Sequence, residues 1–408
     1  MNLQARTAIE ALRAGVPNGA AVQLLGAGDT GMESAFRALL DSAGAEHGIG
    51  LAGGFGTGKS HTLTALGEVA RGQRFVVSRV VISKETPLGD VGRVFEAAMR
   101  RAALPDRNDD ALSAVLGALR AAPGKLEALQ EAVGQADSGL AGIFAAIVFL
   151  LRQKSLTPEV ARRCERFLAG GKMPGSVFRK PLIALHASRK FNLRLPSAAE
   201  LAMQRVRFVS QLFRAAGYAG WCLLFDEVEL IGRYAPMQRG LAYASLAVWL
   251  GLDDAARFSG IAVVYAITDD FVTAVIEHRQ DEDKLPERLR LKGRDTEAMR
   301  ALTAIRHIKD TVVAHRLAVP DAEELARDAR RLREIYSAAY DWNAPELPEV
   351  ERTATRTMRQ YIKAWITQWD MLRVVGQAVS VVEQPLGSNY EVDEGLGVTE
   401  PEAEDPSR

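Results

Sequence analysis

The sequence contains only two cysteines, Cys164 and Cys222, among 408 residues. They form neither a disulfide framework nor a recognisable metal-binding pattern, which favours a reducing compartment. Long apolar runs are also missing, because the longest, from Leu140 to Leu151, falls short of the roughly 20 residues that span a bilayer. Residues 1–15 have amphipathic spacing instead of the pattern of a signal peptide. We therefore expect a soluble, cytoplasmic protein without membrane contact.

An excess of charge of either sign is absent, since 51 basic residues balance 51 acidic residues. A neutral protein has no global field that attracts nucleic acid or a membrane, so any such attraction must come from local clusters. Hydrophobic residues make up 48% of the sequence, which is enough for two or three domains with apolar cores.

Periodicity and composition divide the chain. Residues 1–45 have helical spacing and predict an N-terminal segment of two short helices. Residues 46–297 alternate apolar runs with helical patterns, which predicts an α/β core around a buried parallel sheet. Residues 298–382 predict a C-terminal helical domain, either a lid or a winged-helix-like module. Residues 383–408 are acidic, carry one basic residue and are predicted to be disordered. The predicted strands are residues 47–52, 74–82, 221–225 and 260–268.

The octet GGFGTGKS, residues 53–60, matches the phosphate-loop pattern G-x-x-x-x-G-K-[ST] between a predicted strand and a predicted helix. Its glycines allow a tight turn whose N–H groups face a phosphate, and the helix N-terminus adds its dipole. Lys59 would neutralise the β- and γ-phosphates, and Ser60 would offer a hydroxyl to Mg²⁺. The alternative, a glycine-rich turn that binds nothing, leaves Gly-Lys-Ser at the helix start without a packing role. We predict a site for ATP and Mg²⁺ formed by Gly53, Gly54, Phe55, Gly56, Thr57, Gly58, Lys59, Ser60 and His61.

An acidic pair follows another apolar run, in WCLLFDEVEL. Asp226, at the carboxyl end of this predicted strand, would hold the hydration shell of Mg²⁺. Glu227 would orient and polarise the attacking water, which favours an ATPase over a small-molecule kinase. The alternative is a strand followed by the acidic N-cap of a helix.

Further catalytic candidates follow the last predicted strand. Thr268 would contact the γ-phosphate or the water, although Thr268 or Asp269 could instead cap the next helix. Arg288, Arg290 or Arg294 could reach the γ-phosphate of a neighbouring subunit as an arginine finger, or could simply form a solvated basic turn. A finger supplied by a neighbour would require a homo-oligomer.

The 165 residues between Ser60 and Asp226 exceed what a compact phosphate-loop core needs, which predicts a helical insertion at about 100–214. Residues 152–214 carry fourteen basic residues against three acids. With Phe167, Phe178 and Phe191 interleaved, this basic segment could bind the DNA backbone. It could equally pair with the acidic tail or with a partner protein. Trp365 and Trp369 lie four residues apart and are expected in a helical core.

Several motifs together carry a family resemblance. The runs AIEALRAGVPN, GGFGTGKSH, VVSRVVISKETPL, LLFDEVEL and TATRTMRQYIKAWITQWDM resemble BrxD-type ATP-binding proteins of bacterial BREX anti-phage systems. The resemblance extends to about residue 380. It implies an AAA-like, origin-recognition-related P-loop ATPase encoded beside a large helicase and acting against phage DNA. Gly53, Gly58, Lys59 and Ser60 are then implied for nucleotide, Asp226 for metal and Glu227 for water activation.

Three hypotheses for the function remain. The favoured one is an ATPase coupled to DNA or to a helicase partner in phage defence. The second is a nucleotide-gated assembly module with little turnover, and nothing in the sequence separates these two. The third, an NTP-dependent small-molecule phosphotransferase, is disfavoured by Glu227 and by the basic insertion.

Overall fold

The computed structural model describes most of the chain. The described residues are 2–16, 18–26, 31–42, 48–107, 109–135, 138–253, 260–318, 320–347, 356–377, 389–393 and 396.

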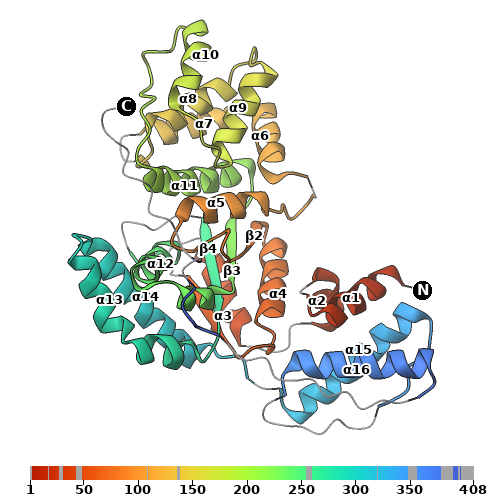
Figure 1. Ribbon diagram of the computed structural model, residues 1–408. Helices are drawn as coiled ribbons and strands as arrows, with labels where there is room; N and C mark the ends of the chain where they lie inside the picture. Colours follow the sequence, from red (N-terminus) through yellow and green to blue (C-terminus); the bar gives the residue numbers. More distant parts are fainter. Residues whose placement is uncertain are drawn as a thin grey trace.

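A four-stranded parallel sheet lies at the centre of the molecule, with strand order β1-β4-β3-β2 (Figure 1). Runs of β-branched and other apolar residues form these strands because both faces of the sheet are covered. Every residue of β3 and β4 is buried, so no face of these strands meets solvent. The strands are β1 (Ile49–Ala52), β2 (Phe75–Val81), β3 (Gly220–Asp226) and β4 (Ile261–Ile267), close to the predicted ranges.

The outer edge of β1 pairs with a short extended segment at residues 315–317. The Ala52 N–H donates to the His315 carbonyl at 2.9 Å, and the Leu317 N–H donates to the Ala52 carbonyl at 2.8 Å. This contact is a parallel bridge between Ala52 and Arg316. The edge of the sheet is thereby covered, and the chain that follows is led toward the carboxyl ends of the strands.

Helices cover both faces of the sheet, so the core consists of three layers: helices, sheet and helices. On one face α3 (Met32–Asp41) and α4 (Lys59–Gly72) pack on residues such as Val77, Leu224 and Val264. The opposite face, with Val76, Leu223 and Val263, belongs to the large core. Side chains therefore alternate between two apolar layers along each strand. The helices of this second layer are α5 (Val91–Arg100), α11 (Ala198–Ala216), α12 (Pro236–Trp249), α13 (Asp281–Arg290) and α14 (Asp295–Ala314).

The insertion forms a helical lobe above α5 in Figure 1. The apolar run at 140–151 becomes α8 (Gly142–Leu151), which is buried because neighbouring helices surround it. None of the described helices is long and apolar enough to cross a membrane. The other elements of the lobe are α6 (Ala111–Ala121), α7 (Pro123–Gly134), α9 (Pro158–Leu168), η2 (Gly175–Phe178) and α10 (Arg179–Ala184).

A separate lid combines both ends of the chain. It contains α1 (Leu3–Ala14), α2 (Gly19–Leu25), α15 (Ala322–Tyr340) and α16 (Met358–Val374), which share one apolar cluster. Trp365 and Trp369 are buried in it, as expected.

The predicted boundaries differ from this arrangement. The described part of residues 1–45 contains three helices instead of two, and α3 packs on α4 and β1 while α1 and α2 join the lid. The boundary expected at 298 falls inside α14, which packs on α12 and α13 instead of on the lid. Helical periodicity alone does not reveal which core a helix joins.

The predicted disorder of the tail is wrong for residues 389–393 and Leu396, which pack against the core. Tyr390 contacts the Phe271 ring, and the Leu396 side chain is buried. The remaining residues of the predicted tail lie outside the described part of the chain.

A buried ion pair fixes α13 against α12. Arg239 Nε and Nη2 donate to the two carboxylate oxygens of Asp281, each at 2.7 Å. Tyr243 donates to the same carboxylate at 3.1 Å, and Arg239 Nη1 donates to the Tyr234 carbonyl at 2.8 Å. These bonds satisfy both charges at a position closed to solvent.

We expect Asp281→Asn to lower the free energy of unfolding by about 3–5 kcal/mol, because it leaves the Arg239 charge buried without its counter-ion. Urea unfolding measures this change. Glu33→Gln breaks the exposed Glu33–Arg37 pair as the control and should cost less than about 1 kcal/mol. Equal unfolding midpoints for the two variants would contradict the role of the buried pair.

Candidate nucleotide site

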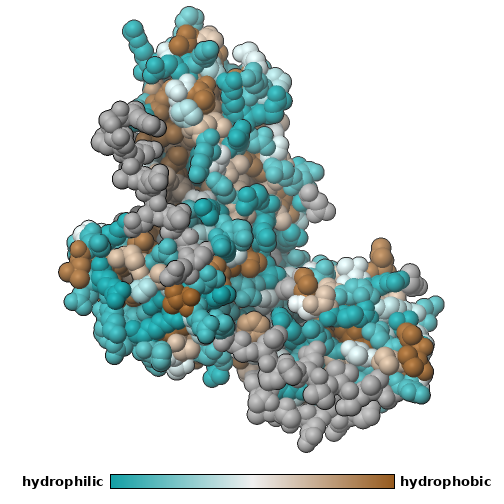
Figure 2. All heavy atoms as spheres, in the orientation of Figure 1, coloured by the Kyte–Doolittle hydropathy of each residue, from teal (hydrophilic) through white to brown (hydrophobic). Residues whose placement is uncertain are grey.

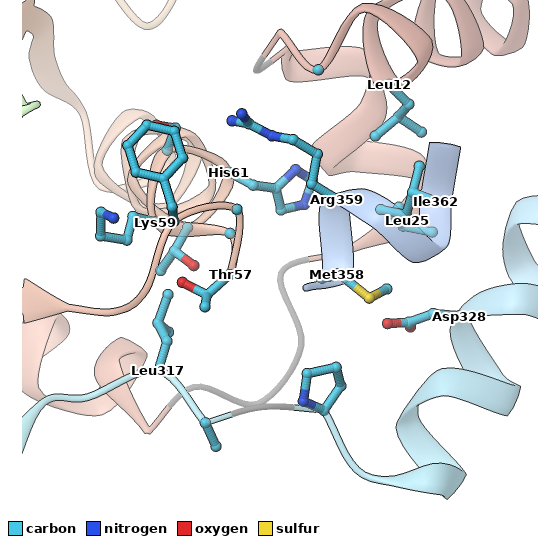
Figure 3. A pocket seen from close by; sticks show the side chains of 18 of the residues that line it. Leu12, Leu25, Thr57, Lys59, His61, Leu317, Asp328, Met358, Arg359 and Ile362 are labelled. Atoms are coloured by element: carbon cyan, nitrogen blue, oxygen red, sulfur yellow. The ribbon is translucent and has the colours of Figure 1, made fainter. Parts of the chain in front are cut away.

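A pocket of about 270 Å³ opens where the carboxyl ends of the strands meet the lid. The loop after β1 and the first turn of α4 form one wall. Side chains of α1, α2 and α16 form the other wall, and Figure 3 shows Leu12, Leu25 and Ile362 on the side opposite Lys59 and Thr57. The residues that bound it therefore come from both ends of the chain and from the sheet.

Glycines shape the loop between β1 and α4. Gly56 and Gly58 have φ of +79° and +111°, a region that side chains with a Cβ rarely adopt. A Cβ on Gly56 would also lie 2.8 Å from Thr357 Oγ1, so the lid approaches the loop backbone closely. Thr57 Oγ1 donates to the Gly54 carbonyl at 2.9 Å and closes the turn. The loop thus has the tight curvature that the motif predicts.

Lys59 is folded back beneath the loop. Its Nζ donates to the carbonyls of Gly53 and Gly54 at 2.8 and 3.2 Å, and lies 3.7 Å from Glu229 Oε1. Only 9% of its side chain is exposed. The two carbonyls and Glu229 therefore balance the charge of the ammonium group. A phosphate group in the loop would compete with them for Lys59.

Ser60 and Asp226, which are 166 positions apart, meet at the carboxyl end of β3. Ser60 Oγ donates to Asp226 Oδ2 at 2.8 Å. A hydroxyl and a carboxylate are the hard oxygen ligands that Mg²⁺ takes beside phosphate oxygens and waters. Among the described residues no group of three or more acidic, His or Cys side chains could hold a metal. These two residues could hold Mg²⁺ together with a nucleotide.

The sequence reasoning missed Arg79 of β2 at this position. Its Nη2 donates to the same Asp226 oxygen that Ser60 contacts, and its Nη1 donates to Thr64 Oγ1 at 3.0 Å. The guanidinium places a positive charge next to the expected metal ligand. An arginine inside the otherwise apolar run RFVVSRVVI was the available signal.

Glu227 follows β3 in a left-handed conformation, with φ of +60°. This conformation is uncommon outside glycine and costs about 1–3 kcal/mol, and such strain clusters at functional sites. The side chain lines the pocket. Desolvation in the pocket wall, and then the charge of Asp226, raises the pKa of this carboxyl. The structure thus places the predicted water-activating group at the pocket.

Glu229 is a second acid that the sequence reasoning did not assign. It is buried in the first turn of η3 (Val228–Arg233), and its Oε2 has no hydrogen-bond partner among the described residues. Burial raises its pKa to about 7, because desolvation outweighs the attraction of Lys59. The sequence signal was the second glutamate of DEVE, which the motif alone does not explain.

Thr268 and Asp269 do not cap the helical segment that follows β4. The Thr268 hydroxyl bonds Tyr390, and Asp269 forms an ion pair with Arg316 at 2.6 Å. The helical turn η5 (Val272–Glu277) has no side-chain cap. Thr268 lies at the tip of β4, between the strand tips that carry the loop and Asp226.

None of the three predicted finger arginines lines the pocket. Arg288 and Arg290 are exposed on α13, and Arg294 precedes α14. A role for Arg288 in a neighbouring subunit stays a prediction.

The lid supplies an arginine that the sequence reasoning missed. The backbone N–H of Arg359 donates to the Gly56 carbonyl at 3.2 Å, and its side chain extends beside the loop in Figure 3.

His61, predicted as part of the loop site, lines the pocket and contacts the Gly26 carbonyl through Nε2 at 2.6 Å. Burial lowers the pKa of His61, which favours a neutral imidazole. Because α1, α2 and α16 lie far from the loop in sequence, no local pattern places them here.

The interpretation of the basic segment is wrong for its aromatic residues. Phe167 and Phe178 are fully buried and contact each other edge to face at 5.7 Å, and Phe191 packs on Phe149. Arg205 is also buried, donates to the carbonyls of Gly170 and Gly171, and has its pKa lowered to about 10 by desolvation.

Other basic residues of the segment do reach solvent. Arg162, Arg166 and Lys180 border a surface hollow of about 950 Å³ that also contains Glu159 and Glu165. Figure 2 shows hydrophilic residues over much of the lobe that carries them.

Residues 2–133 and 182–373 match the family described as BREX system ATP-binding protein BrxC/D. The chain belongs to this family. Membership confirms the resemblance drawn from the motifs and supports ATP binding in anti-phage defence. The match leaves out residues 134–181, which contain α8 and α9 of the insertion. No curated protein and no solved structure matches the chain.

We expect Glu229→Gln to change how stability depends on pH. A carboxyl with a pKa of about 7 in the folded protein and about 4.5 in the unfolded chain keeps its proton longer when folded. The free energy of unfolding therefore falls as the pH rises between these values. Glu229→Gln should reduce this fall by up to about 3 kcal/mol, because one pKa unit corresponds to about 1.4 kcal/mol.

Urea unfolding at pH 5 and pH 8 without nucleotide measures the difference. Glu131→Gln, at an exposed position on α7, serves as the control and should behave as wild type. The same pH dependence in all three proteins would show that Glu229 does not titrate in this window.

Proposed function

We propose that this member of the BrxC/D family is an AAA-like P-loop ATPase that binds ATP with Mg²⁺ and hydrolyses it in anti-phage defence. The observation that carries the proposal is the hydrogen bond between Ser60 and Asp226, since Ser60 lines one pocket together with Lys59 and Glu227. A loop that only turned the chain would need neither this acid nor this lysine.

Each side chain has a task that suits its position. Lys59 would exchange the Gly53 and Gly54 carbonyls for phosphate oxygens, and loop N–H groups would face the same oxygens. Ser60 and Asp226 would hold Mg²⁺, which supplies positive charge to the phosphates. Glu227, with its raised pKa and its place at the pocket, would orient a water and accept its proton.

The far end of the pocket suits an adenine base. Its walls carry apolar side chains from α1, α2 and α16, which suit the faces of a base. Leu12, Leu25, Met358 and Ile362 are the residues in question. A base between the N-terminal helices and the lid would connect nucleotide binding to the position of the lid.

The sheet order supports the AAA-like assignment. Strand β4 separates β1 from β3, so Thr268 comes to lie between the phosphate loop and the acidic tip. Arg359 enters from the lid and would add positive charge next to the γ-phosphate. Arg288 would act only in a homo-oligomer, as a finger toward the neighbouring site.

A nucleotide-gated assembly module is the second candidate. The close contact of the lid with Gly56 favours it, because nucleotide could reorient the lid without turnover. Coupling to DNA through the exposed arginines of the insertion, or to a helicase partner, would apply to either candidate.

We expect Lys59→Ala to lose ATP binding, because the loop then lacks its phosphate counter-charge. We expect Glu227→Gln to keep ATP binding but to release phosphate at least ~100-fold more slowly, the size expected for a general base. Fluorescent-nucleotide titration and phosphate release measure these effects. The controls are Lys125→Ala and Glu131→Gln on α7, far from the pocket. Full turnover by Glu227→Gln would refute its catalytic role, and tight ATP binding with no release by wild type would favour the gated module.

We expect reversal of Arg162, Arg166 and Lys180 to glutamate to weaken duplex DNA binding, and the wild-type affinity to fall steeply with salt. Gel-shift titrations at two salt concentrations test this. Reversal of Arg101, Lys125 and Arg330, which are exposed elsewhere, is the matched control. Equal DNA affinity of both triple variants would remove this surface from any DNA interface.

A further inference from the structure

The C-terminal strap, defined here as residues 389–393 with Leu396, crosses the core near the tip of β4. The Tyr390 ring packs against Phe271 with ring centres 5.8 Å apart. A Cβ on Gly232 would lie 2.8 Å from Tyr390 Cδ1, so the absence of a side chain there makes room for the ring. The Leu396 side chain is buried in the main core. The strap therefore occupies a shaped surface formed by η3 and η5.

Polar contacts hold the strap in register. Arg279 donates to the carbonyls of Gly232 and Tyr390, which joins the strap to η3. Asp393 forms an ion pair with Arg233 at 3.2 Å, and its N–H donates to the Arg233 carbonyl at 2.9 Å. Both backbone groups and side chains of the strap therefore have specific partners on η3 and on Arg279.

The hydrogen bonds of Tyr390 determine where the proton of Thr268 points. The Tyr390 hydroxyl donates to Asp270 Oδ1 at 2.9 Å, because a carboxylate only accepts. A hydroxyl has one proton, so in its bond with Thr268 Oγ1 the tyrosine must accept and Thr268 must donate. The Thr268 proton is therefore used within the protein. Phosphate oxygens at neutral pH mainly accept, so Thr268 has no proton left for a γ-phosphate.

Thr268 is also shielded by this contact. Its side chain is 1% exposed and is not part of the pocket wall. Its neighbours in the sheet carry the groups of the proposed ATPase site, on either side of β4. Withdrawal of Tyr390 would free both the hydroxyl proton and the space in front of it.

We propose that the C-terminal strap is an autoinhibitory segment that binds the η3–η5 surface and withholds Thr268 from the nucleotide. This inference rests on the proposed function. Release of the strap returns the Thr268 proton to the γ-phosphate or the attacking water. The ion pair between Arg233 and Asp393 is 35% and 44% exposed, and such pairs contribute little, so the strap is held mainly by the Tyr390 ring and the Leu396 side chain.

Tyr390→Phe tests the proposal, because it keeps the ring against Phe271 and removes only the hydroxyl. We expect phosphate release to rise about threefold to tenfold, the factor expected for one hydrogen bond. Asp393→Ala removes only the exposed ion pair with Arg233 and keeps the backbone bond, so it should act in the same direction with a smaller effect. Tyr218→Phe removes a tyrosine hydroxyl that bonds Asp106 away from the pocket and should change nothing.

Thr268→Val decides whether the strap acts through Thr268. Tyr390→Phe should give no gain in the Thr268→Val background, and a gain that persists there would overturn the proposal. An unchanged or lower rate of phosphate release in Tyr390→Phe would overturn it as well.

Amide hydrogen exchange of residues 389–393 gives a readout that is independent of turnover. We expect exchange to become faster with a non-hydrolysable ATP analogue, and to rise only slightly in Tyr390→Phe without it, because the ring stays packed on Phe271 and only the hydroxyl bonds are lost. If the wild type binds the analogue but never hydrolyses ATP, hydrolysis is refuted and this exchange result alone decides the strap. If no nucleotide binds, the proposed function and the inhibitory role fail together.

Discussion

A parallel sheet brings the carboxyl ends of its strands to one edge, and this constraint assembles the site from distant parts of the sequence. Ser60 and Asp226 lie 166 positions apart and form a 2.8 Å hydrogen bond because β1, which leads into the loop before Ser60, and β3 belong to one sheet. The intervening β4 carries Thr268 to the same edge. The large insertion between β2 and β3 leaves this geometry intact, since it projects from the side of α5 and α11.

The charged side chains at this edge of the sheet have partners of opposite charge or hydrogen-bonding groups. Lys59 faces Glu229 and two loop carbonyls, while Asp226 faces Ser60 and Arg79. The charges of Lys59 and Asp226 thus have partners inside the protein, which avoids the cost of a buried uncompensated charge. Binding of a nucleotide with its metal is then an exchange of partners, and its affinity reflects the difference between the two sets of contacts.

The parts of this architecture that depend on local sequence were predictable. Strands β2, β3 and β4 appear within two residues of the apolar runs, and the loop glycines and Asp226 follow from short motifs. The features that depend on tertiary contacts were not. Nothing in the sequence around Leu12 or Arg359 reveals that they share a wall, and an acidic, glycine-rich tail does not predict that Tyr390 docks.

The error over the basic segment has a physical cause. Cys164, Phe167 and Leu168 recur at helical spacing and form the buried face of α9, while arginines occupy its other face. The prediction took the phenylalanines and the arginines of the segment as one surface, although in α9 they lie on opposite faces. The periodicity needed to separate them was present in the sequence.

The lid is made from the first and the last helices of the fold, so one small molecule in the pocket would touch α1, α4 and α16 at once. Such a ligand would connect the helices of the lid to the first turn of α4. A partner or DNA that displaced α1 or α16 would therefore change the contacts with the ligand. In turn, a ligand in the pocket would change the position of helices that are exposed at the surface of the lid.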